Sequence, residues 1–142
     1  MKLTFNSLKT KWGEISDEGY IDLDIKHSLS FSIGTNSKGN KSIIISEVKL
    51  HSDIPSTNAV TVNTGVHNDG SCFIEFYLTQ NDFIEEFYHL CWDFISATID
   101  SYSPIQTLLQ KYHSWLKLLQ KKHNKILSFS RQKGLLGELL YL

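Results

Sequence analysis

Residues 71–94, SCFIEFYLTQNDFIEEFYHLCWDF, decide the fold, because the hydrophobic period changes within them. Residues 71–78 read as a strand, rich in aromatic and β-branched side chains. After Thr79 or Asn81, each a candidate N-cap, apolar residues recur at helical spacing. The chain therefore passes here from a sheet into a helical layer.

The helix predicted after residue 80 has two faces of opposite character. One face carries Phe83, Phe87, Leu90, Cys91 and Phe94, and the other carries Glu85, Glu86, His89 and Asp93. An amphipathic helix of this kind buries its apolar face against a core. The acidic face is left for solvent or for a basic neighbour.

Four further strand-like stretches precede residue 71, at 19–27, 28–34, 41–50 and 59–66. The turn-like segment NSKGN (36–40) joins the second of them to the third, and HNDG (67–70) joins the fourth to the strand at 71–78. Five short strands in series predict an antiparallel meander. A short helix is expected ahead of them, over residues 5–12, ending at Trp12.

The C-terminal third is helical in pattern. A helix starts from Ser103 with Pro104 at its first position. Its apolar stripe is Ile105, Leu108, Leu109, Tyr112, Trp115, Leu116 and Leu119. A third helix is expected from Ser128, with Leu127 as a staple residue before it. The predicted fold class is α+β, an antiparallel sheet of about five strands followed by two or three packed helices.

The composition indicates one domain with a substantial core, since the chain has 142 residues and 41% apolar content. No apolar run is long enough to span a bilayer, and the start lacks the features of a secretory signal. We therefore expect a cytoplasmic protein without a membrane partner. Cys72 and Cys91 are expected to be reduced thiols.

Charge is distributed unevenly along the chain. Residues 1–103 carry 7 Lys and Arg against 14 Asp and Glu, whereas residues 104–142 carry 7 against 1. Five lysines, Lys111, Lys117, Lys121, Lys122 and Lys125, project from the polar side of the 104–125 helix. One interpretation is a sequence-blind phosphate contact, with Lys117, Lys121, Lys125, Arg131 and Lys133 as candidate nucleic-acid-binding residues. The other is a solvated face, or one paired with the acidic face of residues 81–100.

A second candidate site involves Glu47 and Lys49, with the acidic residues Asp22 and Asp24 on an earlier strand. This is the outline of an Asp…Glu-x-Lys nuclease site, in which carboxylates hold Mg²⁺ and the lysine orients the attacking water. The order of elements argues against it, because two strands rather than a helix are predicted after Glu47. The six histidines lack zinc-ligand spacing, and the glycines form no phosphate-binding loop.

The segment LSFSRQKGLLGELLYL (127–142) resembles a signature of a bacterial family of PD-(D/E)XK-motif proteins. Trp12, FIEFYL (73–78), FYHLCWDF (87–94) and LLQKYHSWLKLL (108–119) are similar to that family as well. The resemblance implies a restriction-endonuclease-like, Mg²⁺-dependent protein. Such proteins are often grouped with methylase and ATPase components of phage-defence systems.

The resemblance transfers few individual residues. Glu138 matches the glutamate of the signature helix and is the one catalytic candidate, and Gly134 and Gly137 match its small positions. The motif's aspartate and its Glu/Asp-x-Lys strand would lie downstream of Leu142. We therefore expect residues 1–126 to be an N-terminal accessory domain and residues 127–142 to begin the first helix of a nuclease core.

On this hypothesis the segment positions DNA or a partner, turns over no substrate and needs no cofactor of its own, while Mg²⁺ serves the parent protein. The expected partners are DNA, the downstream core of the same polypeptide and a second copy of the chain. Two alternatives remain open. One is an interaction or dimerisation module that uses the leucines of residues 135–142, and the other is a complete small nuclease that uses Asp24, Glu47 and Lys49.

Overall fold

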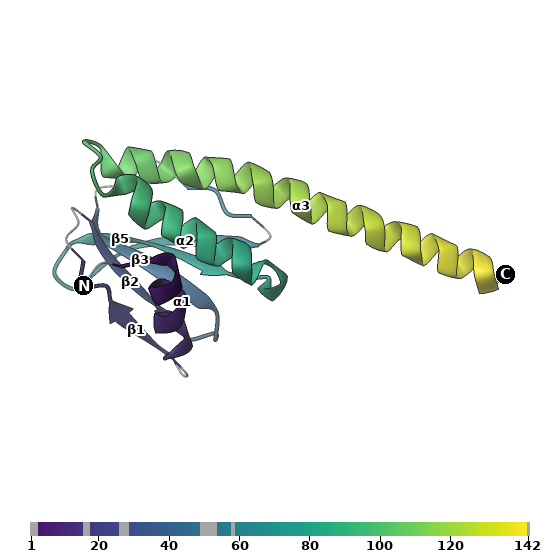
Figure 1. Ribbon diagram of the computed structural model, residues 1–142, viewed down its shortest axis with the longest axis horizontal. Helices are drawn as coiled ribbons and strands as arrows, with labels where there is room; N and C mark the ends of the chain where they lie inside the picture. Colours follow the sequence, from purple (N-terminus) through teal and green to yellow (C-terminus); the bar gives the residue numbers. More distant parts are fainter. Residues whose placement is uncertain (1–2, 16–17, 26–28, 49–53, 58, 142) are drawn as a thin grey trace.

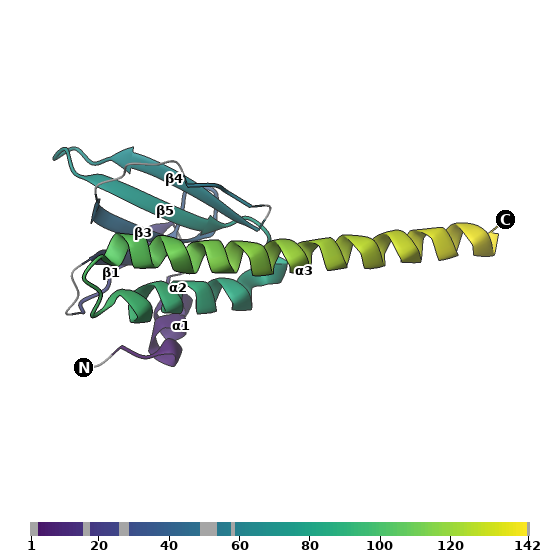
Figure 2. The same ribbon diagram turned by 90° about the horizontal axis from the view of Figure 1, so that it is seen from above.

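The helices lie together on one side of an antiparallel sheet (Figures 1 and 2). The computed structural model describes residues 3–15, 18–25, 29–48, 54–57 and 59–141, and over 47–48 and 126–141 it describes the backbone alone. The elements are α1 (Phe5–Gly13), β1 (Gly19–Asp22), β2 (Ser30–Thr35), β3 (Lys41–Val48), β4 (Val60–Val66), β5 (Cys72–Leu78), the 3₁₀ turn η1 (Asn81–Phe83), α2 (Ile84–Thr98) and α3 (Pro104–Tyr141). The predicted α+β class, with its five strands and helical layer, is confirmed.

The strand order differs from the predicted meander. The sheet runs β1-β2-β3-β5-β4, so that β5 lies between β3 and β4. The central strands β3 and β5 each present apolar residues to the helices, and Ile43, Ile45, Ile74 and Phe76 are all fully buried. The β4 strand, with Asn63, Thr64 and Gly65, offers less apolar surface and takes the edge. Burial of the most apolar strands therefore decides the order.

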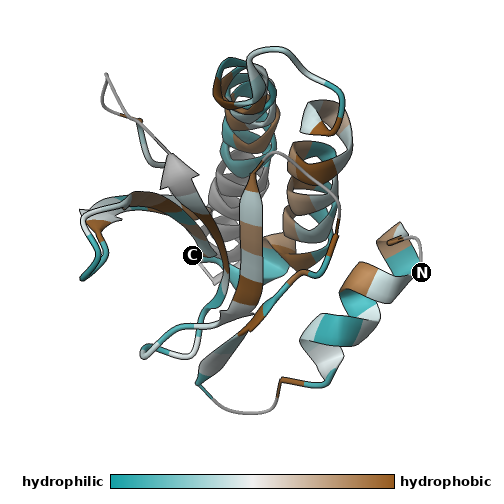
Figure 3. Cartoon of the chain, turned by 90° about the vertical axis from the view of Figure 1, so that its left-hand side faces the viewer, coloured by the Kyte–Doolittle hydropathy of each residue, from teal (hydrophilic) through white to brown (hydrophobic). Residues whose placement is uncertain are grey.

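Phe76 lies at the centre of the core, where the sheet meets both long helices. Its ring centroid lies 4.8 Å from that of Phe94 on α2 and 4.9 Å from that of Tyr112 on α3. In Figure 3 the strands and the long helices carry hydrophobic segments where they face one another, and several connecting turns are hydrophilic. The apolar stripes predicted for the two helices are thus the buried ones.

The short first helix forms as expected and is fixed at both ends. Thr4 and Ser7 form a capping box, in which the Ser7 N–H donates to Thr4 Oγ1 at 3.1 Å and the Thr4 N–H donates to Ser7 Oγ at 2.8 Å. At the other end Trp12 is 1% exposed, and its Nε1 donates to the Gly34 carbonyl oxygen at 3.1 Å. This helix therefore anchors to the sheet through one indole.

Two predicted helix boundaries are wrong. Neither Thr79 nor Asn81 caps α2: the turn η1 intervenes, and Phe83 occupies the N-cap position without a side-chain cap bond. Burial of Phe83, which is 2% exposed, fixes the turn from sheet to helix in place of a polar cap. No separate helix begins at Ser128, because α3 runs unbroken from Pro104 to Tyr141. Residues 120–130 contain no Gly or Pro that would end it.

The α3 helix is much longer than its neighbours. Its 38 residues correspond to about 57 Å of helix, and its C-terminal half stands clear of the sheet and of α2 (Figure 1). None of the described helices is both long and apolar enough to span a membrane.

Candidate functional site

The lysines of α3 are oriented by the residues on its buried side. Leu108 and Tyr112 are fully buried and Leu119 is 2% exposed. At 3.6 residues per turn the opposite side of the helix carries Lys111, Lys117, Lys121 and Lys125, all exposed and within about 120° of its circumference. We call these four residues the lysine row. From first to last it extends along about 21 Å of the helix.

Lys122 differs from the lysine row because it is paired. Its ammonium contacts the Glu86 carboxylate on α2 and lies 5.7 Å from the centroid of the Phe83 ring. Burial alone would raise the pKa of Glu86, but the hydrogen bond and the charge of Lys122 outweigh it, so the pKa lies below its ordinary value. The predicted pairing of basic and acidic faces is therefore found for Lys122.

The other acidic residues of α2 are also engaged. Glu85 pairs with Lys9 of α1 at 3.1 Å, and Asp93 Oδ2 accepts a hydrogen bond from Trp115 Nε1 at 2.8 Å. Among the side chains that the structure describes, the members of the lysine row make no salt bridge. The acidic face of α2 thus leaves the lysine row unneutralised.

Tyr112 and Trp115, the two aromatic residues in the apolar stripe of α3, pack in the core, as predicted. Tyr112 is fully buried, and its hydroxyl donates to the carbonyl oxygen of Pro55. Trp115 is directed toward Asp93, away from the lysine row. The one large apolar residue exposed beside the row is Leu118 among the described α3 side chains, at 51%. Beside the row, the described side chains of α3 therefore offer cations but no exposed Phe, Tyr or Trp ring.

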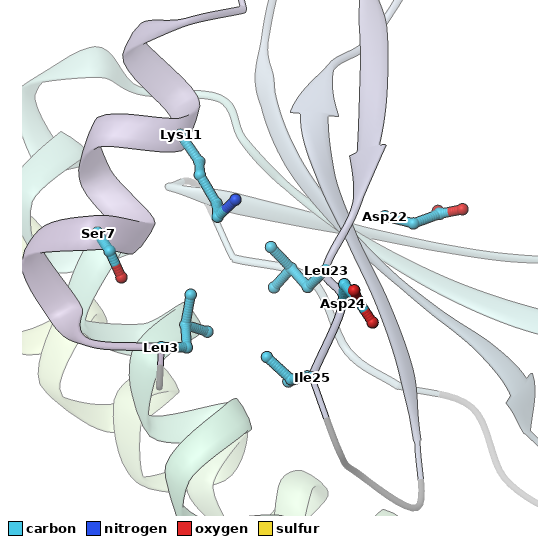
Figure 4. A pocket seen from close by; sticks show the side chains of 7 residues that line it. All are labelled: Leu3, Ser7, Lys11, Asp22, Leu23, Asp24 and Ile25. Atoms are coloured by element: carbon cyan, nitrogen blue, oxygen red, sulfur yellow. The ribbon is translucent and has the colours of Figure 1, made fainter. Parts of the chain in front are cut away.

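The carboxylates Asp22 and Asp24 lie beside a cavity of about 260 Å³ between α1 and the end of β1. Figure 4 shows Lys11, Leu3, Leu23 and Ile25 directed into this cavity, whereas both carboxylates point away from Lys11. Asp22 instead accepts a hydrogen bond from Ser32 Oγ at 2.5 Å. The cavity therefore has a mixed lining, in which Lys11 and three apolar side chains are directed inward and the two carboxylates are not directed at Lys11.

The proposed small-nuclease site is only partly described. The Glu47 side chain and all of Lys49 lie outside the described residues, so their distance from Asp24 stays open. The predicted order of elements holds, since β4 and β5 follow β3. Within the described part of the chain, no group of three or more His, Cys, Asp and Glu residues is placed to hold a metal ion. We therefore derive no metal-dependent step from this geometry.

A polar network on the sheet was not predicted from the sequence. Glu75 Oε2 accepts hydrogen bonds from the Tyr20 hydroxyl at 2.8 Å and from Ser42 Oγ at 2.6 Å. Partial burial is the largest cause that raises the pKa of Tyr20, to about 12. The hydrogen bond with Ser42 lowers this pKa, whereas the hydrogen bond with Glu75 and the charge of Glu75 raise it. Alternation alone placed Tyr20 and Asp22 on one face of their strand. Their proximity to Glu75 depends on the strand order, which the sequence did not reveal.

The remaining candidates are on the C-terminal part of α3. The backbone of Arg131, Lys133 and Glu138 is helical, and their side chains lie outside the described ones. The expected boundary between residues 126 and 127 falls within this continuous helix. These roles stay predictions.

Together these features define an α+β domain that buries one side of a long helix on its own sheet and exposes a row of cations on the other. Comparison with protein families gives a more specific assignment. The chain belongs to the DUF4420 family, described as "Putative PD-(D/E)XK family member", whose family model matches residues 2–142. No curated protein and no solved structure matches the chain.

Proposed function

We propose that this domain binds duplex DNA through the lysine row, as the non-catalytic accessory domain of an Mg²⁺-dependent PD-(D/E)XK endonuclease. The observation that carries the proposal is the unneutralised lysine row, held outward by the buried side of α3. Family membership supports the nuclease context. A role in restriction or phage defence rests on the family resemblance alone.

The lysine spacing suits a phosphodiester backbone. Lys117, Lys121 and Lys125 follow one another at four-residue intervals, which are steps of about 6 Å along the helix. Each ammonium that meets a phosphate releases condensed counterions, and this contact is independent of base sequence. Within the proposal, Arg131 and Lys133 extend the same contact along α3. The domain then fixes where the duplex lies, and another part of the protein supplies the cutting groups.

The DNA-binding step is tested by affinity measurements over a range of salt concentrations. Three or four phosphate contacts give a slope of about −3 to −4 in log K against log salt, or roughly a hundredfold loss of affinity between 50 and 200 mM. The variant Lys117→Glu/Lys121→Glu should abolish measurable binding. The matched variant Lys38→Glu/Lys41→Glu changes the net charge equally but lies at the β2–β3 turn, and it should bind like the wild type. Equal loss in both variants would contradict a role for α3.

The absence of cutting is tested separately. Residues 1–142 with Mg²⁺ or Mn²⁺ and duplex DNA should show no cleavage above that of the Glu138→Ala variant. Cleavage that Lys49→Ala abolishes would instead establish the small-nuclease alternative with Asp24 and Glu47. Under our proposal Lys49→Ala changes stability only slightly.

A further inference from the structure

The cavity of about 260 Å³ between α1 and the end of β1 lies apart from the lysine row, none of whose residues lines it. One water molecule takes about 30 Å³ of the liquid, so this volume suits a ligand of roughly eight non-hydrogen atoms. Ser7 and Lys11 line the cavity from one side of α1, because helical residues four apart share a face. Leu23 and Ile25 line it from the segment that follows β1. The cavity is therefore a space of small-molecule size between two elements of the domain.

Hydrogen bonds hold both walls of the cavity in place. The Leu23 N–H donates to the Phe31 carbonyl oxygen at 2.9 Å, and the Ile25 N–H donates to the Leu23 carbonyl oxygen at 3.0 Å. On α1 the Ser7 hydroxyl is engaged in the capping box, where it donates to the Thr4 carbonyl oxygen at 2.9 Å and accepts from the Thr4 N–H at 2.8 Å. The walls thus need no ligand to form them, and the Ser7 hydroxyl is already committed.

Lys11 places a positive charge inside the cavity. Its side chain is half-buried and directed inward (Figure 4). Among the described side chains its ammonium makes no salt bridge. Asp22 and Asp24 point away from it and are exposed, so water and salt screen their repulsion of an anion in the cavity. A partly desolvated cation without a partner favours an anionic ligand.

The other side chains directed into the cavity restrict what this anion can be. Leu3, Leu23 and Ile25 are apolar, and they offer no donor to a second charged oxygen cluster. Inorganic phosphate would place oxygen atoms against these three side chains without hydrogen bonds, which is costly. A ligand with one charged end and an apolar body satisfies both parts of the lining.

We propose that the cavity binds a small monocarboxylate with a branched apolar body of about five carbon atoms. The carboxylate accepts a hydrogen bond from Lys11 Nζ, and the body packs on Leu3, Leu23 and Ile25. The compound 4-methylpentanoate has this chemistry and about eight non-hydrogen atoms, the size set by the cavity. The site shares no residue with the lysine row, so this inference stands or fails independently of DNA binding.

Isothermal titration calorimetry of the whole chain with 4-methylpentanoate tests the role of Lys11. We expect a dissociation constant of ~0.1–1 mM, which lies within the ceiling for so small a ligand. The variant Lys11→Met keeps the apolar stem and removes the charge, so binding should weaken at least about tenfold, the factor that one charge-assisted hydrogen bond supplies. Lys11→Arg should restore it, because a guanidinium also binds carboxylates. The matched variant Lys38→Met, at the β2–β3 turn, should bind like the wild type.

A ligand series tests the chemistry of the cavity. Acetate, inorganic phosphate and 4-methylpentylamine should each bind at least about tenfold more weakly than 4-methylpentanoate. In methyl-labelled protein the largest chemical-shift changes should fall on Leu3, Leu23 and Ile25. No binding at about 10 mM acid, equal binding by Lys11→Met, or an amine that binds as tightly would each overturn the proposal. A short peptide ending in leucine with a free carboxyl group identifies the source: binding at least about tenfold tighter than that of the free acid would overturn the small-acid assignment.

Discussion

Substitution of Gly34 by Ala tests how β1 is held against β2. The added Cβ would overlap the Gly19 carbonyl oxygen and lie 2.8 Å from the Cα of Tyr20. Both are backbone atoms of β1, so no side-chain rotation relieves the contact. The strand must move, and with it Tyr20, whose hydroxyl donates to Glu75.

The expected cost follows from these contacts. Overpacking of a well-ordered interior costs about 1–3 kcal/mol, and we expect the upper end because backbone must shift. Replacing glycine also lowers the conformational entropy of the unfolded chain, which stabilises the folded state by about 0.4–1 kcal/mol. Gly34→Ala should therefore lower the free energy of unfolding by about 2 kcal/mol. Urea unfolding followed by tryptophan fluorescence measures it, since Trp12 donates to the Gly34 carbonyl.

Two other glycines serve as controls for the same substitution. At Gly65 the new Cβ would meet the ring of Phe73, which can tilt, so we expect a loss of about 1 kcal/mol or less. At Gly13, in the last turn of α1, the new atom has no neighbour within 4 Å, and Gly13→Ala should be neutral or stabilise by up to about 1 kcal/mol. If Gly34→Ala proves as stable as Gly13→Ala, the packing of β1 on β2 is misassigned.

Three further perturbations have defined outcomes. Burial raises the pKa of Tyr112 to about 12 from an ordinary value of 10.0, so between these pH values the folded chain keeps a proton that the unfolded chain releases. The free energy of unfolding should therefore fall as the pH rises from about 10 to 12. Urea titrations at each pH measure this fall, which should be smaller in Tyr112→Phe. Thr4→Ala removes the capping box of α1 and should cost about 1 kcal/mol, with Thr4→Ser close to wild type by the same measurement. Lys9→Ala removes an ion pair whose side chains are 34% and 61% exposed and should cost less than about 0.5 kcal/mol; a larger loss that persists in high salt would mean that packing on Tyr88, rather than charge, holds Lys9.

Local periodicity predicted the elements well because each helix and strand buries one face. The hydrophobic period of two at residues 19–25 predicts the strand β1, and the hydrophobic period of 3.6 from residue 83 onward predicts the helix α2. Both elements form with one apolar face toward the core. Strand order was not accessible in the same way. The sequence of β4 does not show that β5 lies between it and β3. This strand order depends on how much apolar area β3 and β5 together bury against the helices.

The candidate site shows the same division. The lysine row follows from helical spacing alone, since the phase of Leu108, Tyr112 and Leu119 fixes the opposite side. The contact of Tyr20 and Ser42 with Glu75 joins three strands, and no spacing within the chain encodes it. The unbroken α3 was missed because Ser128 looks like an N-cap. An N-cap residue starts a new helix only where the preceding helix has ended, and α3 does not end before Ser128.

The charge asymmetry of the sequence invites the idea that the basic third neutralises the acidic remainder within one molecule. The described contacts argue otherwise. Of the five α3 lysines whose side chains the structure describes, Lys122 pairs with the body of the domain, while two of the acidic residues on α2 are taken by Lys9 and the Trp115 indole. The carboxylates Asp22 and Glu75 lie on the far side of the sheet from α3. The fold thus keeps the lysine row apart from these two carboxylates, and the row remains available to ligands from outside the molecule.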